Sequence, residues 1–176
     1  MRGCRNSSIS EVFLLLLLLP ACGASVADFR VRETEVVIRS DAAFTSTADF
    51  PMRVESTLDA ALAYWGGTWR HLAGVTITFE GQRHVACGDR LGATGCFDGD
   101  IRVSTRDAGF TFLCVEETVL VHEVGHAVIG DRNHLDARWM DFTSVFAQLD
   151  GRRGYSDEGE VACPIFVSVW RHPPAR

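Results

Sequence analysis

The sequence has no stretch rich in arginine and lysine, no internal repeat and no low-complexity linker. Its formal net charge is -6 over 176 residues, with 17 basic and 23 acidic side chains. Because binding to a phosphate backbone needs clustered positive charge, this composition argues against nucleic acid as a partner. The absence of an internal boundary favours one compact domain over residues 28–176, which is long enough to bury a single core.

The longest apolar run, residues 12–20, is too short to cross a bilayer as a permanent helix. It follows a positively charged start, so residues 1–27 are interpreted as an export signal. The letters LPAC that end at Cys22 resemble the lipobox of bacterial lipoproteins, which implies a lipid on Cys22 as the anchor to the cell envelope. The alternative is free secretion after cleavage behind SVA, residues 25–27, with a mature start at Asp28.

Apart from Cys22, both cleavages leave the same four cysteines and no C-x-x-C pair: Cys87, Cys96, Cys114 and Cys163. An even number of cysteines in an exported chain favours disulfides over metal ligands, so a zinc site of four thiolates is the weaker alternative. Three pairings are open. The short, glycine-rich loop between Cys87 and Cys96 favours their pairing, which leaves Cys114 to bond Cys163.

The hydrophobic pattern predicts a mixed α+β domain. The expected strands cover residues 29–40, 74–81 and 99–106, and the expected helices cover residues 54–65, 116–130 and 155–170. The last helix would bring Cys163 close to Cys114.

After a polar start at residues 116–118, the helix expected over residues 116–130 is apolar on nearly every face, and its remaining polar positions are His122, Glu123 and His126. Burying these groups costs free energy unless a partner satisfies them. Histidines four residues apart lie on one helical face and can bind one metal ion, and Glu123 would stand beside that ion. The alternative is a pair of core histidines bonded to the backbone. Gly125 also suggests that another part of the chain packs closely against this helix.

The letters HEVGH, residues 122–126, resemble the active-site helix of zincin metalloproteases, and the following residues resemble the metzincin branch. In that branch a glycine turns the chain, a third histidine binds zinc, and a methionine lies in a tight turn beneath the metal. The resemblance assigns these positions to Gly130, His134 and Met140. It implies a metzincin-like single domain, with a small twisted mixed sheet, an active-site helix and a C-terminal helix.

The spacing departs from the family pattern, because Gly130 and His134 follow His126 by four and eight residues and not by three and six. His134 can still reach the metal, since four residues of chain after the helix span roughly 13 Å. Asp131 and Asp136 are the alternative third ligands.

The resemblance implies a zinc endopeptidase in which Glu123 takes the proton of water bound to Zn²⁺ and the water attacks the peptide carbonyl. The segment over residues 99–105 would then pair with an extended peptide or protein substrate. Two alternatives are open: an inactive zincin-like binding module with a closed metal site, and a metallohydrolase that cleaves a non-peptide amide such as one of the cell wall.

Overall fold

The computed structural model describes residues 25–39, 42, 48–105, 113–145, 153–156 and 159–162. Cys22 and most of the expected export signal lie outside this part of the chain, and so does Cys163. Export, lipidation and the Cys114–Cys163 bridge therefore stay predictions. Neither helix in the described residues is long and apolar enough to span a membrane.

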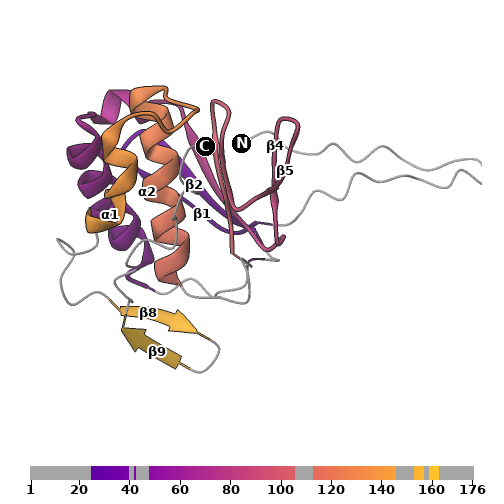
Figure 1. Cartoon of the computed structure of the whole chain (residues 1–176). Helices are drawn as coiled ribbons and strands as arrows, with labels where there is room; N and C mark the ends of the chain where they lie inside the picture. Colours follow the sequence, from indigo (N-terminus) through magenta and orange to yellow (C-terminus); the bar gives the residue numbers. More distant parts are fainter. Residues whose placement is uncertain are drawn as a thin grey trace, which may run out of the picture.

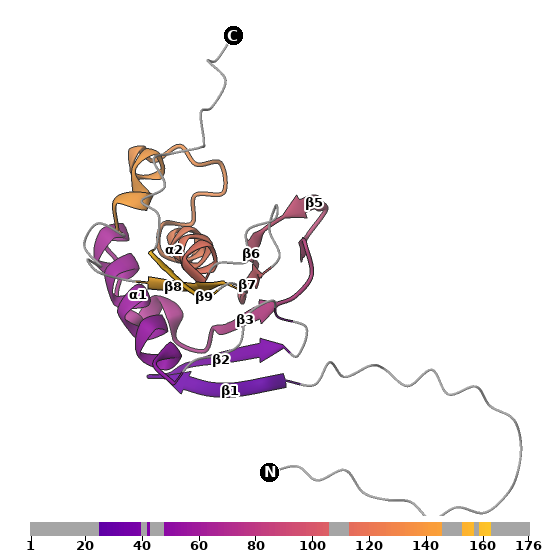
Figure 2. The same cartoon turned by 90° about the horizontal axis from the view of Figure 1, so that it is seen from below.

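A twisted five-stranded sheet forms one layer of the molecule (Figure 2). Its strands lie in the order β1 (Ser25–Val31), β2 (Thr34–Arg39), β3 (Thr76–Glu80), β7 (Ile101–Ser104) and β6 (Gly95–Phe97). The three inner strands β2, β3 and β7 are parallel. The two outer strands, β1 and β6, each pair antiparallel with their inner neighbour. The fold is therefore the mixed α+β class that the sequence predicts.

Two helices, α1 (Phe50–Trp65) and α2 (Leu113–Ile129), cover one face of the sheet (Figures 1 and 2). Helix α1 begins with Pro51 in its first turn, where a missing N–H is tolerated, and it ends at Gly66, whose φ of 75° suits glycine. The helices pack on each other, and the Trp65 indole donates a hydrogen bond to the Val121 carbonyl at 2.8 Å. Their apolar faces and the inner strands form the core, which includes Phe50, Leu58, Leu62, Ile77, Phe79, Ile101, Val103, Leu120 and Val124.

Shorter elements complete the described chain. They are η1 (Trp69–Leu72), β4 (Val85–Cys87), β5 (Arg90–Ala93), η2 (Ala137–Met140), η3 (Phe142–Ser144), β8 (Arg153–Ser156) and β9 (Gly159–Ala162). Strands β4 and β5 form one hairpin, and β8 and β9 form another. The second hairpin lies near the beginning of α2 (Figure 1).

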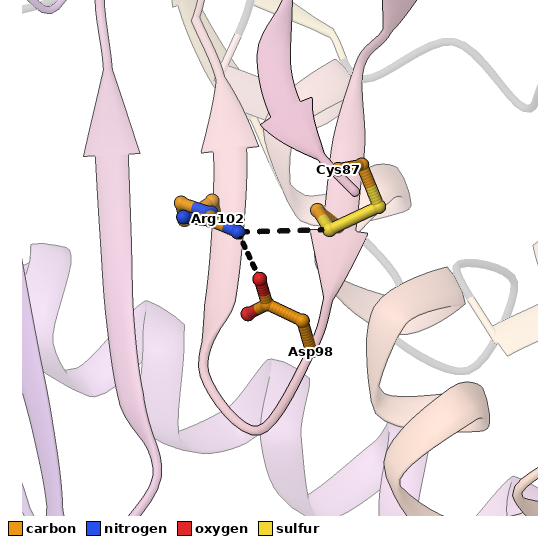
Figure 3. Close-up of a disulfide and its surroundings, with 4 residues drawn as sticks. Cys87, Asp98 and Arg102 are labelled. Atoms are coloured by element: carbon orange, nitrogen blue, oxygen red, sulfur yellow. Dashed lines mark hydrogen bonds and ion pairs between the residues drawn. A yellow bond between two sulfur atoms is a disulfide. The ribbon is translucent and has the colours of Figure 1, made fainter. Parts of the chain in front are cut away.

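The disulfide between Cys87 and Cys96 is present, as predicted, and it joins the β4–β5 hairpin to β6 (Figure 3). The two Cα atoms are 5.3 Å apart. Arg102 on β7 lies beside this bridge, with Nη2 at 3.9 Å from the Cys96 sulfur, and it forms an ion pair with Asp98. The bridge therefore fixes the hairpin to the outer strand next to α2.

Two of the expected elements need correction. The single strand predicted over residues 29–40 is a hairpin, because the chain turns at Arg32, which takes a left-handed φ of 56°. The helix predicted over residues 155–170 is wrong in its described part, where β8 and β9 pair Tyr155 with Glu160 and Ser156 with Gly159.

Candidate metal centre

Three histidines meet at the C-terminal end of α2. His122 and His126 lie one turn apart on the helix, with ring centroids 4.9 Å from each other. The chain after the helix brings the His134 ring to 4.9 Å from His122 and to 4.8 Å from His126. One ring nitrogen from each histidine lies within 4.8 Å of the others. The three ligands predicted from the sequence are thus brought together.

The geometry and the protonation of this cluster both fit a metal ion. Tetrahedral coordination at about 2.1 Å would place two ligand nitrogens roughly 3.4 Å apart, and the Nε2 atoms of His122 and His134 are 3.1 Å apart. Burial, followed by the neighbouring His126 and His134, lowers the pKa of His122 to about 3. Burial also lowers the pKa of His126. Both imidazoles are therefore neutral at physiological pH, which is the form that binds metals.

The ring of His126 is oriented by the backbone. Its Nδ1 lies 2.9 Å from the carbonyl oxygen of Asp131. Because a carbonyl oxygen only accepts hydrogen bonds, Nδ1 carries the proton of the neutral ring. The lone pair on Nε2 is left for an ion, an arrangement typical of metal-binding histidines.

Trp139, not Met140, packs beneath the three imidazoles. The centroid of the Trp139 ring lies 4.8, 4.7 and 4.5 Å from the ring centroids of His122, His126 and His134, respectively. Trp139 is 6% exposed, whereas Met140 is 63% exposed. The expectation that Met140 lies beneath the metal is therefore corrected. In the 3₁₀ turn η2, successive side chains point about 120° apart, so only one of the two neighbours can face the histidines.

The close packing expected at Gly125 is confirmed. A Cβ atom at this position would lie 2.7 Å from the Trp139 ring and 2.7 Å from the Trp65 ring. Trp65 and Trp139 also contact each other, at a centroid distance of 4.4 Å. The glycine thus lets α1 and η2 approach the backbone of α2 between the two histidines of the helix.

Glu123 lies on α2 next to His122 and is outside the group of possible ligands. It is only 4% exposed, and its Oε1 atom is so close to Gly95 on β6 that a Cβ there would lie 2.4 Å from it. Burial raises the pKa of Glu123 to about 8, although the positive charge of Arg90 on β5 partly opposes this shift. Glu123 is therefore a buried carboxyl that can hold or release a proton near neutral pH.

The two aspartates considered as third ligands have other partners. Asp131 accepts hydrogen bonds from the backbone N–H groups of Asn133 and Asp136. Asp136 binds the guanidinium of Arg138, which lowers the pKa of Asp136 to about 2. The possible metal ligands in the described residues include His134 and neither aspartate.

The strand expected to pair with a substrate cannot do so. β7 is bonded to β3 on one side and to β6 on the other, so it has no free edge. The outer strand on the β7 side of the sheet is β6, which contacts α2 through Gly95. Sequence patterns did not reveal the roles of Gly95, Arg90 and Trp139, because each depends on contacts between distant segments.

Comparisons of the chain with protein-family models, with curated proteins and with solved structures find no significant match.

Proposed function

We propose that this chain is a zinc-dependent metallopeptidase of the metzincin-like type, with His122, His126 and His134 as the zinc ligands. The observation that carries the proposal is a cluster of three imidazole nitrogens with a buried carboxyl beside it on the same helix. Three histidines are a ligand set of catalytic zinc sites, in which the fourth position is open to water or substrate. Neither nearby aspartate belongs to the cluster, which supports an open fourth position.

Zinc bound to these residues would supply a Lewis acid that acidifies water and polarises the substrate carbonyl. Glu123 takes the proton of the attacking water and later gives it to the leaving amine. Its position beside the ligands, and not among them, suits this task. Its pKa is raised by burial, and a nearby divalent cation would favour the carboxylate form that accepts the proton.

We further propose that an extended peptide lies along the outer edge of β6. Strand addition satisfies the backbone groups of a peptide at the edge of a sheet. The strand carries Gly95 against the Glu123 carboxyl, so a peptide on this edge would pass close to the general base. Hydrolysis of a cell-wall amide would need the same chemistry. Cleavage assays with a panel of peptides and cell-wall amides would distinguish the two substrate classes.

We also propose that the protein works outside the cytoplasm, either anchored by a lipid on Cys22 or secreted. The Cys87–Cys96 disulfide supports this location, because structural disulfides persist mainly in oxidising compartments. Mass spectrometry of the mature N-terminus distinguishes a lipidated Cys22 from a free Asp28.

The first prediction distinguishes the role of the zinc ligands from the role of Glu123 as general base. Glu123→Gln should keep stoichiometric zinc after dialysis and lose about 10²- to 10⁴-fold in kcat/KM on protein substrates. His134→Ala should lose zinc and hydrolysis together. Elemental analysis and a peptide-cleavage assay measure both quantities.

His71→Ala is the matched control, because His71 is an exposed histidine on η1 outside the cluster. It should keep both zinc and activity. Retention of zinc by His134→Ala would remove His134 from the ligand set. A wild-type protein that binds zinc but cleaves neither peptides nor cell-wall amides would favour the binding-module alternative.

A further inference from the structure

The loop between α2 and η2 holds His134 in an unusual backbone conformation. Gly130 ends the helix with a φ of 65°, and His134 has a φ of 56°. Glycine tolerates the left-handed region, whereas a residue with a Cβ is strained there. His134 nevertheless points its ring at His122 and His126. Contacts elsewhere in the loop must therefore stabilise this conformation.

The carboxylate of Asp131 provides such contacts on both sides of His134. Its Oδ1 accepts a hydrogen bond from the Asn133 N–H at 3.0 Å, and its Oδ2 accepts one from the Asp136 N–H at 2.8 Å. These bonds lower the pKa of Asp131, the Asp136 N–H most strongly, with a further contribution from the Leu135 N–H. The loop is two residues longer than the spacing of the metzincin branch, and the Asp131 carboxylate folds it into a closed turn.

Asp131 also contacts the other two parts of the site. The same Oδ2 accepts a hydrogen bond from the indole N–H of Trp139 at 3.1 Å, which orients the ring beneath the imidazoles. The backbone carbonyl of Asp131 accepts the Nδ1 proton of His126 at 2.9 Å. Asp131 therefore orients His126 on the helix, the loop that carries His134, and the Trp139 ring beneath the imidazoles.

We propose that Asp131 is a positioning residue that sets the affinity and the coordination geometry of the metal without binding it. The inference rests on the proposed metal site. With the carboxylate present, His134 is already placed for coordination when an ion arrives. Without this carboxylate, the loop must become ordered during binding. The free energy that this ordering costs weakens metal binding. Residues that orient metal ligands typically contribute 10- to 100-fold to affinity.

The test measures zinc binding and not only turnover. The wild type, Asp131→Asn and Asp131→Ala are titrated with zinc in competition with a chromophoric chelator. Asparagine keeps one acceptor oxygen but turns an NH₂ group towards donors, so it preserves only one side of the network. We expect Asp131→Ala to bind zinc about 10- to 100-fold more weakly than the wild type, with Asp131→Asn between the two.

The visible absorption of the cobalt(II)-substituted proteins reports coordination geometry, which a loss of stability alone would not change. It should differ between the wild type and the Asp131 variants. Asp136→Asn is the matched control, because that aspartate lies in the same loop but its side chain binds Arg138. Its zinc affinity and cobalt spectrum should match those of the wild type. Circular dichroism of each zinc-free variant verifies folding, and the isosteric Asp131→Asn is the decisive variant if the alanine variant unfolds.

Wild-type zinc affinity and an unchanged cobalt spectrum in a folded Asp131→Asn protein would overturn the positioning role and leave the proposed function intact. Weakened zinc binding in this variant, together with a wild type that binds zinc but hydrolyses nothing, would uphold the positioning role and reject the peptidase. A wild type that binds no zinc would reject both.

Discussion

Gly95 on β6 leaves almost no space beside the carboxyl group of Glu123. A Cβ at this position would lie 2.4 Å from Oε1 of Glu123 and 2.5 Å from a methyl carbon of Val119. We therefore expect Gly95→Ala to displace the carboxylate while the three histidines keep their positions. A shift of about 1 Å in a reacting group can lower a rate roughly 10²-fold. Cleavage assays should show a loss of this size, and elemental analysis should show unchanged zinc.

Gly67→Ala is a suitable comparison for this variant. A Cβ there would lie 2.6 Å from Val128, so it also crowds α2, but away from Glu123. It should lower stability and leave the proposed activity of the folded protein intact. Equal losses of activity in the two variants would mean that crowding of the helix, and not displacement of Glu123, explains the effect.

Glu123 and His122 also predict how the stability of the zinc-depleted protein depends on pH. The pKa of Glu123 is raised from 4.5 to about 8, so over this interval the folded protein keeps a proton that the unfolded chain has released. Stability therefore falls as the pH rises. The pKa of His122 is lowered from 6.5 to about 3, so below pH 6.5 the unfolded chain takes up a proton that the folded protein does not. Stability therefore falls as the pH falls through this range.

His122 affects the pH dependence of stability only below 6.5, which is its ordinary pKa. Above pH 6.5, Glu123 therefore makes the dominant contribution to this pH dependence. Urea unfolding of chelator-treated protein should show a free energy of unfolding that declines from pH 6.5 towards the Glu123 pKa of about 8. Glu123→Gln cannot ionise, so it should remove this decline. A decline that persists in the variant would assign it to another group.

At the scale of elements, a buried ion pair joins the two helices. Arg53 on α1 binds Glu117 on α2 at 3.0 Å, and the Glu117 side chain is 1% exposed. Thr57 donates a further hydrogen bond to the same carboxylate at 3.3 Å. Arg53→Met removes the positive charge but leaves the carboxylate buried, and breaking one partner of such a pair costs about 3 to 5 kcal/mol. Chemical denaturation should reveal a decrease of this size.

The exposed ion pair between Arg32 and Glu55 supplies the control for that measurement. Glu55→Gln should change the free energy of unfolding by less than about 1 kcal/mol, because water screens exposed charges. A similarly small effect of Arg53→Met would show that Glu117 is accommodated without its arginine.

The sequence predicts elements well where local signals agree with tertiary packing. Helix α2 combines apolar positions with a glycine after its last residue, and α1 ends at a glycine pair. The β1–β2 turn was missed because Arg32 takes a left-handed conformation that glycine or asparagine usually signals. The C-terminal hairpin was missed because the acids after Ser156 resemble the first turn of a helix.

At the scale of the whole molecule, the site forms where the end of α2 and the loop after it meet the outer strand β6. Helical spacing predicted two ligands, and the family resemblance added His134. The order of the strands was not predictable in the same way, because β6 lies outside β7 although it precedes it in the chain. The proposed substrate edge depends on that order, and so does the contact between Gly95 and Glu123.

The packing of Trp139 against the imidazoles gives the protein a built-in fluorescent reporter. Its ring lies 4.5 to 4.8 Å from the ring centroids of all three histidines. An ion held by those rings would sit almost in contact with an indole. Copper(II) or cobalt(II) accepts excitation energy efficiently at such a distance, whereas zinc(II), with a filled d shell, does not. Emission from the unlabelled protein would thus distinguish a quenching ion from a silent one as each enters the site.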